Sequence, residues 1–135
     1  MRSAPLESLP ATSARTTAVT LVLFGVWNVA MWSARVRNIV GDPDLDTTGR
    51  LWWSLPAVLF AAGGAVALLR RWLPGTAAGW VVRAAASCTV VYWPVRTVLL
   101  VGNGHAAGFV AVHVVLAVVS VGLATAVLLR FRPAR

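Results

Sequence analysis

Polar and apolar positions alternate along this chain in long blocks. Four of the apolar blocks are long enough to cross a bilayer, and they cover about residues 16–34, 51–69, 80–101 and 108–129. A spanning helix needs about 20 mostly apolar residues, and in lipid a helix pairs its own backbone polar groups. The pattern therefore predicts an all-α fold, a bundle of four transmembrane helices.

Polar segments flank these blocks. Residues 1–15 contain Pro, Ser and Thr and predict a flexible cytoplasmic tail, and residues 131–135 predict a basic cytoplasmic tail, with a single transmembrane domain at 16–130 between them. The longest predicted connection, residues 35–50, holds three of the four acidic residues. A Gly-rich turn at 102–105 makes the last two helices a tight antiparallel hairpin.

The first apolar block has the position of a secretory signal peptide. Its length of 19 residues, Thr16 to Ala34, exceeds the usual apolar core of about 7–15 residues. Small residues at both the −3 and −1 positions are also hard to find near its end, where Met31 and Trp32 lie. We therefore interpret the block as an uncleaved helix.

Composition supports a membrane protein. Hydrophobic residues make up 59% of the chain and charged residues 12%, and a soluble domain of 135 residues cannot bury so much apolar surface. The net charge of +8 would suggest nucleic acid binding in a soluble protein. Here the basic residues lie mainly at helix ends, where they set topology and bind lipid headgroups. We expect membrane lipids as partners and no nucleic acid.

The distribution of arginine predicts the orientation. All twelve basic residues are Arg. With the N-terminus inside, eight of them lie on the inner side and four on the outer side, together with three Asp. Cytoplasmic segments carry an excess of positive charge. The sequence thus predicts an N-in, C-in multi-pass protein of the cell membrane.

Three polar residues inside the predicted spans share one depth. At 1.5 Å rise per residue, Asn28, Arg96 and His113 lie roughly 8–9 Å below the outer ends of their helices. Helical spacing places Asn28 on one face of the first helix, together with Gly25, Trp32 and Arg35. The second helix offers the small residues Ala57, Ala61 and Gly64, which allow close helix packing. These observations predict a compact bundle with polar groups toward its outer half.

Arg96 is the most informative of these residues, because an Arg within a span costs about 2.5–3.5 kcal/mol at the bilayer centre. Its guanidinium could hold an anion, a lipid phosphate or a carboxylate. Alternatively, Arg96 reaches up to the outer headgroups or pairs with an Asp of the first connection. His113 could relay protons or bind a ligand, or it could form an interhelical hydrogen bond. Asn28 could contact a ligand, or it could form an interhelical hydrogen bond.

Aromatic residues gather in the outer half of the predicted bundle, and they form either an interfacial belt or an apolar ligand pocket. They are Trp27, Trp32, Trp52, Trp53, Tyr92 and Trp93. If a ligand site exists, Arg96 would bind an anionic group. His113 and Asn28 would orient that group, and Trp32 and Tyr92 would line the apolar part.

Other chemistries lack their residues. The lone Cys88 excludes an intrachain disulfide and is expected to be a small buried hydrophobe. The Asp residues at 42–46 resemble the start of a calcium loop, but Thr47 and Trp53 replace its Gly and Glu. They are expected to balance Arg35, Arg37 and Arg50, and Asp46, Thr47 or Thr48 is expected to cap the second helix. No metal cluster or cofactor motif has recognisable spacing. No predicted span contains an acidic residue, which disfavours a proton-coupled exporter.

Two segments carry a resemblance. They are the run from Trp32 to Asn38 with Asp42 following, and the run from Val112 to Ser120. Both resemble uncharacterised small four-helix integral membrane proteins of actinobacteria. The resemblance covers most of the chain and implies no activity.

These observations favour a non-enzymatic protein, either an accessory subunit of a larger membrane protein or a homo-oligomer that binds lipid or an apolar ligand. An alternative is a small oligomeric transporter or channel with the outer polar layer as its selectivity site. A second alternative is an enzyme acting on a lipid-linked substrate, with His113 as acid or base. No catalytic residue is assigned, because no carboxylate or nucleophile clearly accompanies the His.

Overall fold

The computed structural model describes residues 11–73 and 76–131, and this part of the chain forms four α-helices and no strand. The helices are α1 (Ala11–Val40), α2 (Thr47–Leu69), α3 (Thr76–Gly102) and α4 (Ala107–Arg130). All four are long and apolar enough to cross a membrane. The predicted all-α fold with four apolar helices is confirmed.

Much of the helix surface is both exposed and apolar. Val98 on α3 is 70% exposed and Val118 on α4 is 67% exposed, and Leu59 on α2 is exposed as well. Water would oppose so much apolar exposure, whereas lipid solvates it. The exposed side chains therefore form the surface expected of a protein that lies in a bilayer.

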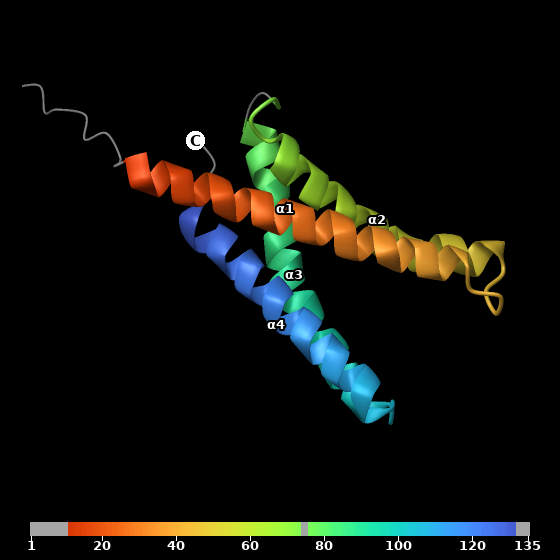
Figure 1. The fold of residues 1–135 in the computed structure, drawn as a ribbon. Coiled ribbons are helices and arrows are strands. Elements are labelled where there is room, and N and C mark those ends of the chain that lie inside the picture. Colours follow the sequence, from red (N-terminus) through yellow and green to blue (C-terminus); the bar gives the residue numbers. More distant parts are fainter. Residues whose placement is uncertain (1–10, 74–75, 132–135) are drawn as a thin grey trace, which may run out of the picture.

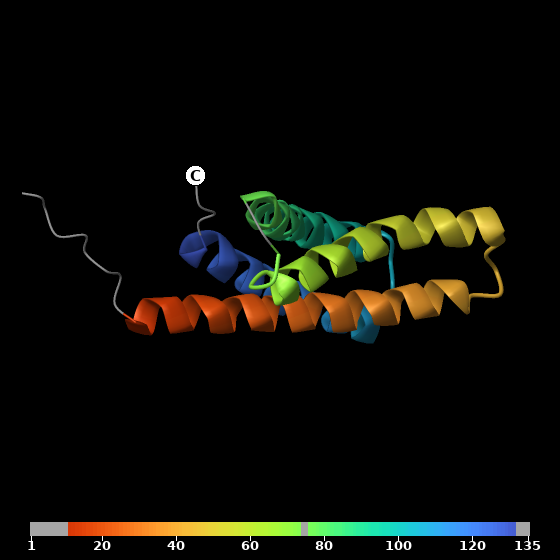
Figure 2. The ribbon, with the colours of Figure 1, turned by 90° about the horizontal axis from the view of Figure 1, so that it is seen from above.

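The four helices are arranged as two antiparallel hairpins, α1–α2 and α3–α4. The α1–α2 connection lies far from the α3–α4 connection, because the hairpins cross and diverge toward these two turns (Figures 1 and 2). We call the part of the molecule that holds these two connections the turn end. The opposite end, with the start of α1 and the end of α4, is called the terminal end.

A glycine contact holds α1 against α2. A Cβ atom on Gly25 would lie 2.8 Å from the carbonyl oxygen of Gly64, and one on Gly64 would lie 2.8 Å from Cβ of Asn28. No larger side chain fits there unless the helices move apart. Small residues thus set the close approach of this hairpin, as their spacing predicted.

The terminal half of the bundle is packed and hydrogen-bonded across hairpins. Its buried apolar cluster draws on all four helices and comprises Phe24, Ala67, Val82, Ala86, Ala124 and Val127. Trp27 Nε1 donates to Ser120 Oγ at 2.9 Å, which joins α1 to α4. Arg83 donates to the carbonyl oxygens of Leu128 and Phe131 at the end of α4. These contacts fix the two hairpins together from the middle of the bundle to its terminal end.

The helices extend beyond the predicted limits. Residues 35–40 belong to α1 and 47–50 to α2, so the predicted long connection shrinks to residues 41–46. Apolar composition marks where lipid ends, whereas a helix continues as long as its backbone stays paired and its residues permit it. Asp46 ends the connection by accepting a hydrogen bond from the Gly49 amide at 2.7 Å, which confirms the predicted cap.

The structure also bears on the two predicted tails and on Cys88. Residues 11–15 are helical, whereas the rest of the predicted N-terminal tail, residues 1–10, lies outside the described residues. Residues 132–135 of the predicted C-terminal tail also lie outside them. Cys88 is exposed, so the expectation of a buried side chain is wrong. It lies on a face of α3 that no helix covers.

Candidate functional site

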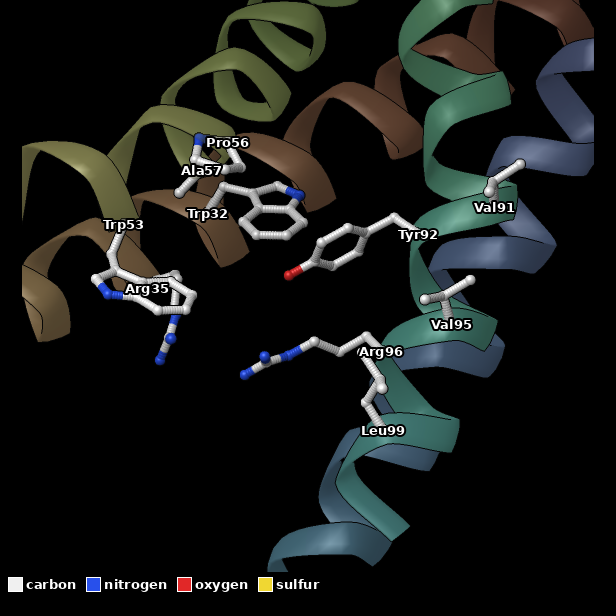
Figure 3. A pocket seen from close by; sticks show the side chains of 10 residues that line it. All are labelled: Trp32, Arg35, Trp53, Pro56, Ala57, Val91, Tyr92, Val95, Arg96 and Leu99. Carbon is white, nitrogen blue, oxygen red and sulfur yellow. The ribbon is translucent and has the colours of Figure 1, made fainter. Parts of the chain in front are cut away.

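A cleft lies between the two hairpins and consists of two adjoining hollows, each of about 300 Å³. Four residues line both hollows: Trp32 and Arg35 from α1, and Tyr92 and Arg96 from α3. Figure 3 shows Arg96 and Tyr92 reaching from α3 toward α1, where Trp32 and Arg35 lie. Because the hairpins diverge toward the turn end, the space between α1 and α3 is not filled by packed side chains.

The two hollows open on different sides of this central group. The first hollow is completed by α2 and by the outward face of α3, through Trp53, Pro56, Ala57, Val91, Val95 and Leu99. The second is completed by α1, α3 and α4, through Met31, Ala34, Asn38, Trp93, Phe109, His113 and Leu116. Apolar and aromatic side chains dominate both linings, so the cleft suits an apolar group with a charged end.

Aromatic rings form the floor of the cleft. Trp32 stacks on Phe60 with ring centroids 4.7 Å apart and planes at 10°. Tyr92 meets Trp32 edge-on, with centroids 5.3 Å apart, and Trp93 packs edge-on against Tyr92. Such contacts contribute about 0.5–1.5 kcal/mol each beyond area burial. The floor is therefore a rigid surface that joins α1, α2 and α3.

Two indole N–H groups in this floor have no hydrogen-bond acceptor. Trp32 and Trp93 are each only 4% exposed. Their Nε1 atoms are buried and unpaired within the part of the chain that the structure describes. A buried donor without a partner costs about 1–3 kcal/mol. Both residues line the second hollow, so polar groups beside the cleft are left unsatisfied.

The two arginines of the cleft also lack partners. Neither Arg35 nor Arg96 forms a hydrogen bond or ion pair with any other described residue. The alternative in which Arg96 pairs with an Asp of the first connection is thus not seen. Asp42 instead accepts from the Asp44 amide, and its carbonyl oxygen accepts from Arg50. Two positive charges face the cleft without a counter-charge.

His113, on α4, lines the second hollow together with Arg96 of α3. Its Nδ1 lies 2.9 Å from the carbonyl oxygen of Phe109, and its ring packs on the Phe109 ring with centroids 4.2 Å apart. A carbonyl can only accept, so Nδ1 is the donor in this contact. Nε2 is then left as the group that can serve a ligand.

Asn28 is the one predicted site residue that does not line the cleft. Its side chain is 2% exposed and donates to the carbonyl oxygen of Phe24, one turn earlier in α1. It packs against Gly64 at the α1–α2 contact. The other four predicted residues, Arg96, His113, Trp32 and Tyr92, all line the second hollow.

Several cleft residues were not singled out from the sequence as site residues. Arg35 was assigned to topology, although its spacing already placed it on the face of Trp32. The sequence does not indicate Phe60 as a site residue, because a single aromatic residue in an apolar helix is common. Trp93 is predicted only as one of six aromatic residues that form either a belt or a pocket. Only the three-dimensional contact among α1, α2 and α3 distinguishes these residues.

The arrangement can bind an anion and an apolar group together, but it offers little for catalysis. Neither lining contains an acidic residue, a Ser or a Cys among the described residues. No group of three His, Cys, Asp or Glu side chains within the described ranges could hold a metal ion. Among the described lining residues, the Tyr92 hydroxyl is the one nucleophilic group that would accompany a general acid or base at His113.

No protein-family model, no curated protein and no solved structure matches the chain. The resemblance to small actinobacterial membrane proteins stays a prediction.

Proposed function

We propose that this chain is a non-enzymatic multi-pass protein of the cell membrane that holds an anionic lipid in the cleft between its hairpins. The observation that supports this most is the pair Arg35 and Arg96. Both face the cleft above an aromatic floor, and neither has a counter-charge among the described residues. A phosphate or carboxylate would supply the charge-assisted hydrogen bonds that the two guanidinium groups lack.

The position of the cleft along the helices fits a lipid headgroup. Arg96 lies six residues before the end of α3 at Gly102, which is about 9 Å along the helix axis. If Gly102 lies at the headgroup level, the Arg96 guanidinium would lie just below it and could reach a phosphate. With the termini cytoplasmic, as the excess of Arg at the terminal end favours, the cleft opens in the outer leaflet.

Native mass spectrometry from gentle detergent tests the proposal, with phosphatidylglycerol and phosphatidylcholine offered in equal amounts. Wild type is expected to retain phosphatidylglycerol. Arg96→Met and Arg35→Met keep the apolar stem but remove the donors, and each should weaken retention about tenfold, the value of one charged hydrogen bond. The same spectra report whether the protein is a monomer or a homo-oligomer.

Arg37→Met is the matched control. Arg37 lies on α1 two residues from Arg35, is exposed, and lines neither hollow. The Arg37→Met variant should retain phosphatidylglycerol as well as wild type does. Equal retention by all four proteins would show that the cleft arginines are membrane-surface anchors, and the proposal would be rejected.

A further inference from the structure

An apolar groove of about 400 Å³ runs between α2 and α3 on the outside of the bundle. Pro56, Phe60 and Gly63 of α2 line one wall, and Ala84, Ala85 and Cys88 of α3 line the other. The groove is shallow and smooth because small residues form its base. A Cβ atom on Gly63 would lie only 2.5 Å from Cβ of Ala85, so the two helices touch there.

This groove is continuous with the cleft. Pro56 lines both the groove and the first hollow. Phe60 lines the groove and also stacks on Trp32 of the cleft floor. The apolar surface of the groove therefore begins where the floor beneath Arg96 ends.

The length of the groove matches one lipid tail. Cys88 lies eight residues from Arg96 along α3, and Ala84 lies twelve, which correspond to about 12 and 18 Å. Half of a bilayer hydrocarbon core is about 15 Å thick. A chain whose headgroup lies at Arg96 would thus follow the groove to the middle of the membrane.

We propose that the α2–α3 groove holds an acyl chain of the lipid whose headgroup binds Arg35 and Arg96. The inference rests on the proposed function and names its ligand class, a long-chain anionic lipid as opposed to a small soluble anion. Charge favours this occupant over a second copy of the chain. Each copy carries a net charge of +8, so a second copy would offer little negative charge to Arg35 and Arg96, whereas an anionic lipid supplies it.

The test compares long-chain and short-chain phosphatidic acid, titrated into detergent-solubilised protein and counted by native mass spectrometry. Cys88→Trp fills the groove, and Ser87→Trp adds the same ring at an exposed neighbouring position outside it. Cys88→Trp should weaken binding of the long-chain lipid about tenfold, the effect of losing contacts with a few methylene groups. It should leave the short-chain lipid unaffected, and Ser87→Trp should change neither.

Arg96→Met distinguishes the headgroup site from the acyl-chain groove, because it should weaken binding of both lipids. If Arg96→Met weakens both but Cys88→Trp acts like Ser87→Trp, the headgroup site stands and the tail lies elsewhere, which overturns this inference. If Arg96→Met affects neither lipid, the proposed function fails as well. If Cys88→Trp converts a dimer into a monomer without changing lipid binding, a second copy covers the groove and the inference is wrong.

Discussion

At the terminal end of the bundle, arginine side chains donate to backbone and hydroxyl groups of neighbouring helices, whereas the two arginines that face the cleft toward the turn end have no such partner among the described residues. Arg83 donates to the carbonyl oxygens of Leu128 and Phe131, and Arg130 donates to Thr20 Oγ1 at 3.2 Å. Arg35 and Arg96 have no such partner within the described residues. Arg83 and Arg96 even belong to the same helix, α3, so composition alone does not separate their roles.

This difference shows how a charged residue near a membrane span can be interpreted. An Arg that satisfies the last carbonyl groups of a helix stabilises the fold, because those groups lack partners within the helix. An Arg that faces a cleft without a partner carries an uncompensated cost, which binding of an anion would remove. Whether an Arg has a hydrogen-bond partner, and not its depth in the membrane, therefore distinguishes an Arg that stabilises the fold from one in the candidate site.

Replacing Arg83 should produce the largest effect on stability. Arg83→Met removes two charge-assisted hydrogen bonds that join α3 to the end of α4, at 3.3 and 2.8 Å. The free energy of unfolding should fall by about 2–4 kcal/mol. Thermal unfolding in mild detergent measures this, with Arg37→Met as the control for loss of a charge. A fall no greater than that of the control would mean that the terminal end is held by apolar packing alone.

Replacing Arg96 should act on the ligand-bound state only. In lipid-free detergent, Arg96→Met should unfold at the same temperature as wild type, because no hydrogen bond is lost. Phosphatidylglycerol at about one hundred times its dissociation constant should stabilise wild type by about 2.7 kcal/mol. Because the variant is expected to bind about tenfold more weakly, the same lipid concentration should stabilise it by only about 1.4 kcal/mol. If lipid-free Arg96→Met is as unstable as Arg83→Met, the two arginines have the same structural role.

The smallest effect is expected midway between the two ends, at the hydrogen bond from Trp27 to Ser120. Ser120 is 1% exposed, and Ser120→Ala removes the acceptor without adding bulk. Hydrogen bonds between membrane helices contribute about 0.6 kcal/mol on average. Unfolding of Ser120→Ala should show a loss of that order, against Thr125→Ala on the exposed side of α4. Loss of lipid retention without loss of stability would instead extend the cleft to this depth.

The existence of four helices could be predicted from the sequence because lipid imposes a strict length and composition on each span. The helix limits could not, because Arg35 and Arg37 continue α1 beyond the apolar block. Apolarity reports the solvent of a segment, and helix ends depend on local caps such as Asp46.

The site was predictable only in part. Counting residues along each helix is enough to bring Arg96 and His113 to one level. It does not reveal that Asn28 bonds to its own helix, or that Phe60 completes the floor. Both depend on the angle at which α1 packs against α2, which the close contact at Gly25 and Gly64 helps to set. No periodicity in a single sequence encodes that angle.

The hollows lie at the side of the bundle, and this position determines how a ligand would enter them. Each lies between helices whose exposed faces are apolar, such as those carrying Val91 and Val95. A ligand would therefore enter sideways, by diffusion within one leaflet and without crossing water. Its occupancy would follow the mole fraction of that lipid in the leaflet, so the protein would respond to membrane composition in the way that a soluble binding protein responds to concentration.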